Sequence, residues 1–200
     1  MRRDQLAHVL RAAADTLAAT EGSGRKDFYV IGSAAILASV EDLDLPIEAT
    51  RSDEGDLVPF DDPDGRKTDL IDGAIGELSP FASAFGFYGH GVDLSTAWLP
   101  AGWRDRLVVF DAPSTLTPAR GHCLERHDLA ASKVAVLRRK DADFVRALLD
   151  RGLIDPDVLL ARLELLPRDR VPARKLGDAR RFVEGWIAQR QRRPRASGTR

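Results

Sequence analysis

The sequence contains a single cysteine, Cys123, among its 200 residues. One cysteine excludes an intrachain disulfide and any metal cluster built from several thiolates, and it is typical of a reducing compartment. No stretch approaches the roughly eighteen apolar residues that a membrane span requires. The first residues are charged and then amphipathic, so they lack the apolar core of a signal peptide. We therefore expect a cytoplasmic protein without a membrane partner.

The sequence also lacks an excess of charge of one sign. Its formal net charge is −1, although charged residues make up 30% of the chain, so the total charge predicts no particular partner. The distribution of charge is uneven, because residues 41–72 are strongly acidic and residues 162–200 are mainly basic. An acidic region beside a basic region suits a metal and a nucleic acid, although solvated helix surfaces give the same pattern.

The most informative stretch begins with a short apolar strand at residues 28–31. This strand ends at Gly32-Ser33, and the helix-forming residues 34–37 follow. A glycine lets the backbone come close to a ligand, and a serine hydroxyl and the free amides of a helix start can donate to phosphate oxygens. The alternative is that Gly32-Ser33 is an ordinary turn after a strand.

Acidic residues alternate in the second half of this stretch. Ser52, Glu54 and Asp56 occupy every second position, and in a strand this spacing places the three side chains on one face. Two carboxylates on one face could bind a hard cation such as Mg²⁺. The simpler interpretation is the solvated face of an edge strand.

Together, the Gly32-Ser33 turn and the S-x-E-x-D strand about twenty residues later resemble the signature of the DNA polymerase β-like nucleotidyltransferase superfamily. That family usually has aspartate at both carboxylate positions, so Glu54 is a departure. The resemblance implies an α/β fold in which a small mixed β-sheet, flanked by helices, carries a Mg²⁺ site, with a helical C-terminal half. It also implies a third carboxylate on a neighbouring strand, for which Asp93 is the candidate.

A second resemblance concerns residues 123–153. We expect Asp128 to cap a helix that carries Lys133, and a second helix to follow and end at Gly152. From the residues alone, Lys133 is expected to extend to water. However, the run D-L-A-A-S-K at residues 128–133 and the later Lys140-Asp141 pair resemble the small stand-alone nucleotidyltransferase-like proteins of the AbiEii and MenT toxin families.

This second resemblance implies that Lys133 neutralises a triphosphate and that Asp141 orients the nucleotide or supports the site. On one continuous helix Lys133 and Asp141 would lie about 12 Å apart along the axis. They would then flank a nucleotide without contacting each other. His90 and His122 lie in predicted turns beside glycines, where histidines either contact a ligand or, more often, are simply exposed.

The sequence predicts an α/β core over residues 1–122 and a helical part over residues 123–191. Within that part, Asp155-Pro156 predicts a helix start. Residues 192–200 form a basic tail without apolar residues to bury, and we expect this tail to be disordered.

The expected function, implied by the resemblance, is Mg²⁺-dependent transfer of a nucleoside monophosphate from an NTP to a hydroxyl. The acceptor would be a tRNA end, and the protein would be a toxin with a cognate antitoxin. Two alternatives are a catalytically inactive nucleotide- or RNA-binding protein with the same fold and a ligand-free interaction module. The catalytic candidates are Glu54, Asp56, Lys133 and Asp141, of which Glu54 and Asp56 bind the metal; the nucleotide-binding candidates are Gly32, Ser33, Ser52 and Lys133.

Overall fold

The computed structural model describes residues 1–192. The predicted disorder of the basic tail therefore concerns residues that lie almost entirely outside the described part of the chain. Only Arg192 of that tail is described, and it is the last residue of helix α8.

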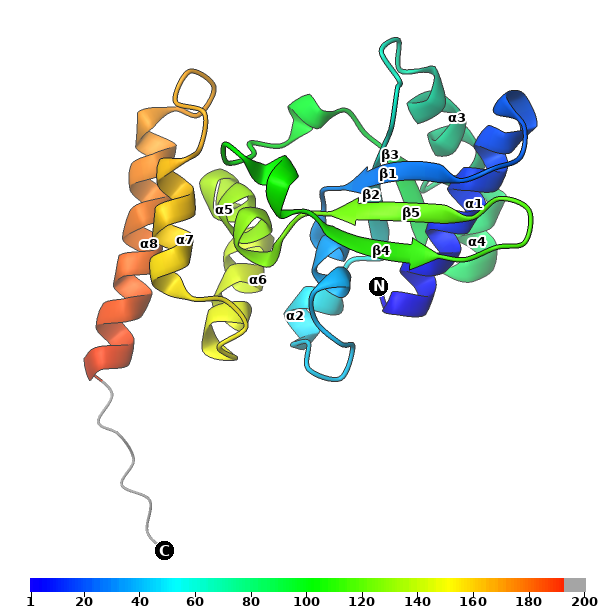
Figure 1. Ribbon diagram of the computed structural model, residues 1–200. Coiled ribbons are helices and arrows are strands. Elements are labelled where there is room, and N and C mark those ends of the chain that lie inside the picture. The colour runs from blue at the N-terminus through cyan, green and yellow to red at the C-terminus, as the bar shows by residue number, and fades with distance from the viewer. Residues whose placement is uncertain (193–200) are drawn as a thin grey trace, which may run out of the picture.

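The core of the molecule is a mixed five-stranded sheet with the strand order β3-β2-β1-β5-β4 (Figure 1). Strand β1 pairs parallel with β5 and antiparallel with β2, while β2 pairs parallel with β3 and β4 pairs antiparallel with β5. This arrangement confirms the predicted α/β class. The strands are β1 (Lys26–Val30), β2 (Glu54–Pro59), β3 (Tyr88–Gly91), β4 (Val108–Ala112) and β5 (Ala119–Cys123).

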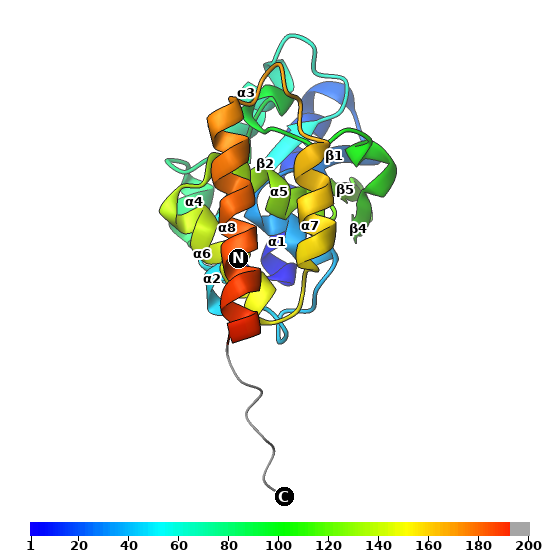
Figure 2. The same cartoon turned by 90° about the vertical axis from the view of Figure 1, so that its left-hand side faces the viewer.

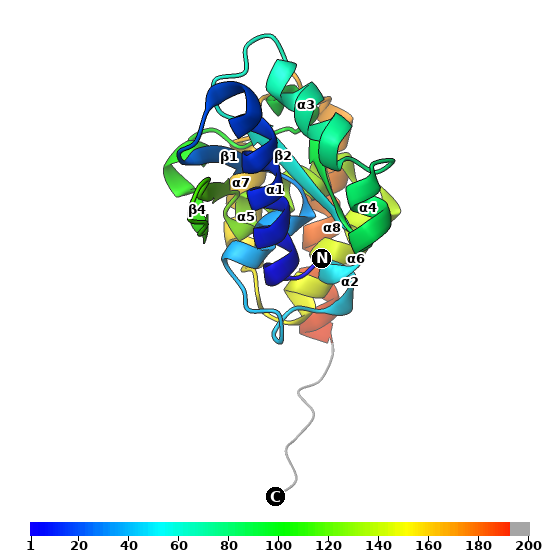
Figure 3. The same cartoon turned by 90° about the vertical axis from the view of Figure 1, so that its right-hand side faces the viewer.

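One face of the sheet is covered by the helices α1 (Arg3–Glu21), α3 (Arg66–Ile75) and α4 (Pro80–Phe85), which lie behind the sheet in Figure 1 and in front of it in Figure 3. Alternate strand residues face these helices, as the period of two requires. Gly55 of β2 lies against Val9 of α1, and Gly89 of β3 lies against Val9 and Ile75 of α3. The strand residues on either side of these glycines, among them Glu54, Asp56 and His90, therefore face the other side of the sheet.

The C-terminal half is helical, as predicted, and consists of α5 (Arg126–Val136), α6 (Arg139–Asp150), α7 (Pro156–Glu164) and α8 (Ala173–Arg192). Helix α5 packs against the other three, and α7 and α8 form the outer layer (Figure 2). The predicted helix start at Asp155-Pro156 is confirmed, because the Asp155 carboxylate accepts hydrogen bonds from the Asp157 and Val158 amides. The predicted boundary at residue 122 falls one residue before the end of β5.

Short helical segments connect these elements. They are the 3₁₀ helices η1 (Ser33–Ala38), η2 (Leu94–Thr96) and η3 (Trp103–Arg106) and the α-helical turn α2 (Ile47–Thr50). The segment after Gly32 is thus a six-residue 3₁₀ helix whose apolar residues are buried.

The predicted cap of α5 is wrong. Glu125 caps this helix, because its carboxylate accepts hydrogen bonds from the amides of His127 and Asp128. Asp128 lies in the first turn and is fully buried. Its carboxylate forms ion pairs with Arg106 of η3 and Arg162 of α7, so Asp128 joins three elements instead of ending one.

Candidate functional site

A cleft of about 730 Å³ lies between the sheet and the helical half. It is lined by residues from the end of β1, from β2 and β3, and from α5 and α6. Every residue predicted for the site except Asp93 lies on this cleft, so positions that are distant in the sequence come together. The lining includes Gly32, Ser33, Ser52, Glu54, Asp56, His90, Lys133 and Asp141.

The carboxylates of Glu54 and Asp56 lie side by side on β2. They face the cleft because Gly55 between them faces α1. The Asp56 side chain is 26% exposed. Burial, the negative charge of Glu54 and a hydrogen bond with Glu54 raise the pKa of Asp56 to about 6, against the smaller effects of Lys133 and His90. The two neighbouring carboxylates therefore repel each other when both are ionised, and a shared proton relieves this repulsion.

Gly32 leaves room for the Asp56 carboxylate, because it has no side chain. A Cβ on residue 32 would lie 1.6 Å from Asp56 Oδ2, so any side chain there would displace this carboxylate. The Ile31 amide also donates to the Asp56 carbonyl oxygen at 3.2 Å. The sequence analysis expected this glycine to let a ligand approach the backbone; in the structure the Asp56 carboxylate makes that close approach.

The two predicted serines, Ser33 and Ser52, both line the cleft but lie in different local structures. Ser33 is the first residue of η1 and lines the cleft. Ser52 lies before β2, which begins at Glu54, so it does not belong to the predicted alternation within the strand. Its hydroxyl accepts a hydrogen bond from the Glu54 amide at 3.3 Å, and this bond shapes the turn into the strand.

His90 lies beside the two carboxylates. It belongs to strand β3 and not to the turn that we predicted for it. The β2–β3 register sets His90 beside Asp56, and its Nδ1 atom lies 2.9 Å from Glu54 Oε1 and 3.7 Å from Asp56 Oδ1. One ligand atom from each of these three residues lies within 4.8 Å of the others. The overlooked signal is the alternation Gly89-His90-Gly91, because both glycines lie where helix α3 leaves no room for a Cβ.

Asp93 does not contribute the predicted third carboxylate. It caps η2, where its carboxylate accepts a hydrogen bond from the Ser95 amide at 2.7 Å. The side chain is exposed, and the pKa of Asp93 is lowered by its hydrogen bonds to Ser95. His90 stands where the resemblance implied an acid.

His122, also predicted in a turn, lies in β5 with its Nε2 atom 2.8 Å from Asp27 Oδ1.

Lys133 and Asp141 contact each other, contrary to the separation expected on one helix. Leu137 adopts a left-handed conformation with φ of 58° and ends α5, and α6 begins two residues later. The reversal brings Lys133 Nζ to 3.6 Å from Asp141 Oδ1. Asp141 is 1% exposed and also accepts a hydrogen bond from Arg138 Nε at 2.7 Å. Asp141 therefore positions the lysine from the wall of the cleft and is itself almost inaccessible to solvent.

The lysine is held away from bulk water. Its side chain is 14% exposed, and its Nζ atom lies 4.9 Å from the centre of the Phe144 ring. Burial lowers the pKa of Lys133, while Asp141 and Asp56 raise it. The prediction that Lys133 would extend to water is wrong. Its charge instead lies beside the carboxylates of the cleft.

The mouth of the cleft carries further cations. Arg51 follows α2, and Arg138, Arg139 and Lys140 lie at the start of α6. All four are exposed. Two acidic residues of the same lining, Glu48 and Asp143, offset part of this charge, and Arg138 is paired with Asp141.

Comparison with family models, curated proteins and solved structures gives no match to this chain. The resemblance to nucleotidyltransferases thus rests on the sequence motifs alone. None of the helices in residues 1–192 is long and apolar enough to cross a membrane.

Proposed function

We propose that the protein is a divalent-metal-dependent nucleotidyltransferase, which moves a nucleoside monophosphate from an NTP to a hydroxyl and releases pyrophosphate. One observation carries this proposal. Asp56, one of the paired carboxylates of β2, lies against Gly32, which follows β1 by two residues, and Ser33 and the largely buried Lys133 line the same cleft. This constellation provides cation ligands, a phosphate-side hydroxyl and a fixed positive charge.

Each residue has a separate role in this proposal. Glu54 and Asp56 hold the divalent cation, for which the resemblance implies Mg²⁺. When bound, such a cation neutralises charge on phosphate oxygens. Ser33 donates its hydroxyl to the triphosphate, and Lys133 stabilises the negative charge that develops during displacement. Asp141 and Arg138 keep the lysine in place.

The resemblance further suggests a tRNA end as the acceptor and the role of a toxin with a cognate antitoxin. The basic mouth of the cleft supports a polyanionic acceptor. Arg51, Arg138, Arg139 and Lys140 are exposed there, and exposed arginines and lysines are the groups that contact a nucleic-acid backbone.

The test is incubation of the purified protein with each α-labelled NTP, a divalent cation and total RNA. We expect label on RNA and release of pyrophosphate with at least one NTP. Asp56→Asn should abolish both, because it removes one of the two metal-binding carboxylates. Asp93→Asn is the matched control, since this exposed carboxylate lies outside the cluster, and it should retain full activity.

The alternatives give different results in the same assay. Binding of NTP without release of pyrophosphate would identify a catalytically inactive nucleotide- or RNA-binding protein. Binding of neither NTP nor metal would contradict the proposal and favour an interaction module.

A further inference from the structure

The ligand set of the cleft contains a nitrogen atom. His90 Nδ1 faces Glu54 Oε1 at 2.9 Å and Asp56 Oδ1 at 3.7 Å. Two atoms each about 2.1 Å from a small dication lie about 3 Å apart in adjacent octahedral positions and about 4.2 Å apart in opposite ones. The first separation, which is a hydrogen bond in the metal-free protein, equals the adjacent value, and the second lies between the two values. The ring is 44% exposed, so an ion reaches it from the cleft.

The donor types decide which dication fits. Mg²⁺ is a hard ion that favours oxygen ligands and keeps much of its water. Imidazole nitrogen suits transition metals, whose affinities for a given mixed site rise along the series from Mn²⁺ to Cu²⁺. A set of two carboxylates and one imidazole therefore fits Mg²⁺ poorly at one of its three positions.

We propose that Glu54, Asp56 and His90 form a site for a first-row transition-metal dication, for which Mn²⁺ serves as the probe, with His90 Nδ1 as a direct ligand, in preference to Mg²⁺. The inference concerns the same cleft as the proposed function and specifies its metal. It does not require that the protein transfer nucleotides, because the three ligands belong to the chain itself.

A third carboxylate, that of Asp72, lies near the other nitrogen of the His90 ring. Asp72 Oδ1 of α3 is 3.9 Å from His90 Nε2, a separation that a small side-chain rotation converts into a hydrogen bond. Metal-binding histidines commonly donate their other N–H to a carboxylate, which fixes the ring and strengthens the ligand. Asp72 is thus a positioning residue for His90.

The test uses metal ions alone, without nucleotide or RNA. The full chain is stripped with a chelator and titrated with MnCl₂ and, separately, with MgCl₂ by calorimetry. We expect Mn²⁺ to bind at least tenfold more tightly than Mg²⁺. Pulsed electron paramagnetic resonance of the Mn²⁺ complex should show coupling to one directly bound ¹⁴N nucleus, which no carboxylate supplies.

Three substitutions sharpen this test. His90→Ala should weaken Mn²⁺ binding at least tenfold, change Mg²⁺ binding less than threefold and remove the nitrogen coupling. His90→Asp should restore an all-oxygen set and reverse the preference toward Mg²⁺. Asp72→Asn should weaken Mn²⁺ binding by a smaller factor and retain the coupling.

His122→Ala is the matched control. This histidine also lies on a strand with a ring nitrogen 2.8 Å from a carboxylate, Asp27, but it is not among the three residues of the cluster. Its loss should leave Mn²⁺ binding and the nitrogen coupling unchanged. Thermal melting of each variant shows whether it is folded.

The outcomes separate this inference from the proposed function. Equal affinities for the two ions, absence of Mn²⁺ binding, or an unchanged nitrogen signal in His90→Ala would overturn the metal assignment, even if the protein transfers nucleotides. Tight Mn²⁺ binding through nitrogen, without nucleotide transfer under any condition, would leave the metal site standing and overturn only the proposed reaction.

Discussion

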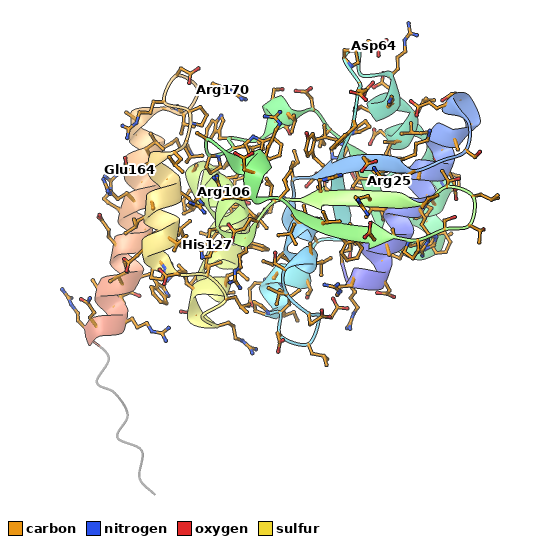
Figure 4. The ribbon with its side chains drawn as sticks, in the orientation of Figure 1. Arg25, Asp64, Arg106, His127, Glu164 and Arg170 are labelled. Atoms are coloured by element: carbon orange, nitrogen blue, oxygen red, sulfur yellow. The ribbon has the colours of Figure 1, made fainter. Side chains whose placement is uncertain are left out.

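Asp56 and Asp128 are both withdrawn from water, but their partners have opposite charges. Asp128 is fully buried, and its two carboxylate oxygens lie 2.8 Å from Arg106 Nε and 2.9 Å from Arg162 Nε. Arg106 lies beside the helical half of the molecule (Figure 4). Asp56 instead faces a second carboxylate, Glu54.

The difference separates a structural charge from a functional one. Asp128 finds its counter-ions within the chain, so its burial needs nothing from outside. Asp56 is repelled by its neighbour, and perturbed acids of this kind cluster at functional sites. The proposed cation would relieve this repulsion, which otherwise raises the free energy of the fold.

The largest expected effect on stability is that of Asp128→Ala. This substitution leaves two partly buried guanidinium groups without their shared anion, and breaking a buried ion pair in this way destabilises by about 3–5 kcal/mol. Chemical denaturation measures the loss. Asp111→Ala, which removes the exposed partner of Arg120, should change stability by less than about 1 kcal/mol. A loss below about 1 kcal/mol for Asp128→Ala would contradict the assigned role.

A smaller effect of opposite sign is expected for Asp56→Asn. The pKa of Asp56 is raised from 3.8 to about 6 in the folded protein, so the folded state holds its proton more tightly than the unfolded state. Stability from this group is therefore present below about pH 4 and is lost as the pH rises through 6. Asparagine avoids that loss and should stabilise the metal-free protein at pH 7 by on the order of 1–3 kcal/mol.

Melting curves between pH 4 and 8 check this prediction. The gain from Asp56→Asn should be small at pH 4, increase toward pH 6 and remain constant above it. A saturating divalent cation should reverse the order at pH 7, because it stabilises only the parent protein. A gain that is independent of pH would show that repulsion at this carboxylate is not its source.

The smallest effect on stability belongs to Lys133→Met. The ion pair with Asp141 is lost, but Arg138 remains on Asp141 and the methionine retains the packing of the stem, so we expect a change within about 1 kcal/mol. Turnover in nucleotide transfer should fall on the order of a hundredfold to a thousandfold, since a preorganised charge is removed. Lys140→Met, at the exposed mouth, is the control. A folded Lys133→Met protein with parent activity would exclude Lys133 from the site.

What the sequence predicts here is local. The alternation of Glu54 and Asp56 and the helix start at Asp155 need only neighbouring residues, and both are confirmed. His90 depends on the pairing of β3 with β2, and Asp128 depends on arginines 22 and 34 residues away in the chain. Such long-range partners leave no periodic signal.

The contact between Lys133 and Asp141 escaped prediction for a more specific reason. It depends on the left-handed Leu137, and leucine is a residue for which this conformation is uncommon. No glycine or asparagine marks the corner, so although two successive helices are predicted, the sequence does not show that the chain reverses sharply between them.

The close approach of Gly32 and Asp56 has a consequence for ligand cooperation. The turn that would touch the triphosphate and the carboxylate that would touch the metal are in van der Waals contact, so neither can shift without the other. A ligand that orders one of them lowers the entropy that the second ligand must remove. By linkage the effect would be reciprocal: under the proposed function, nucleotide and metal would each tighten the binding of the other, because residue 32 has no side chain to separate the turn from the carboxylate.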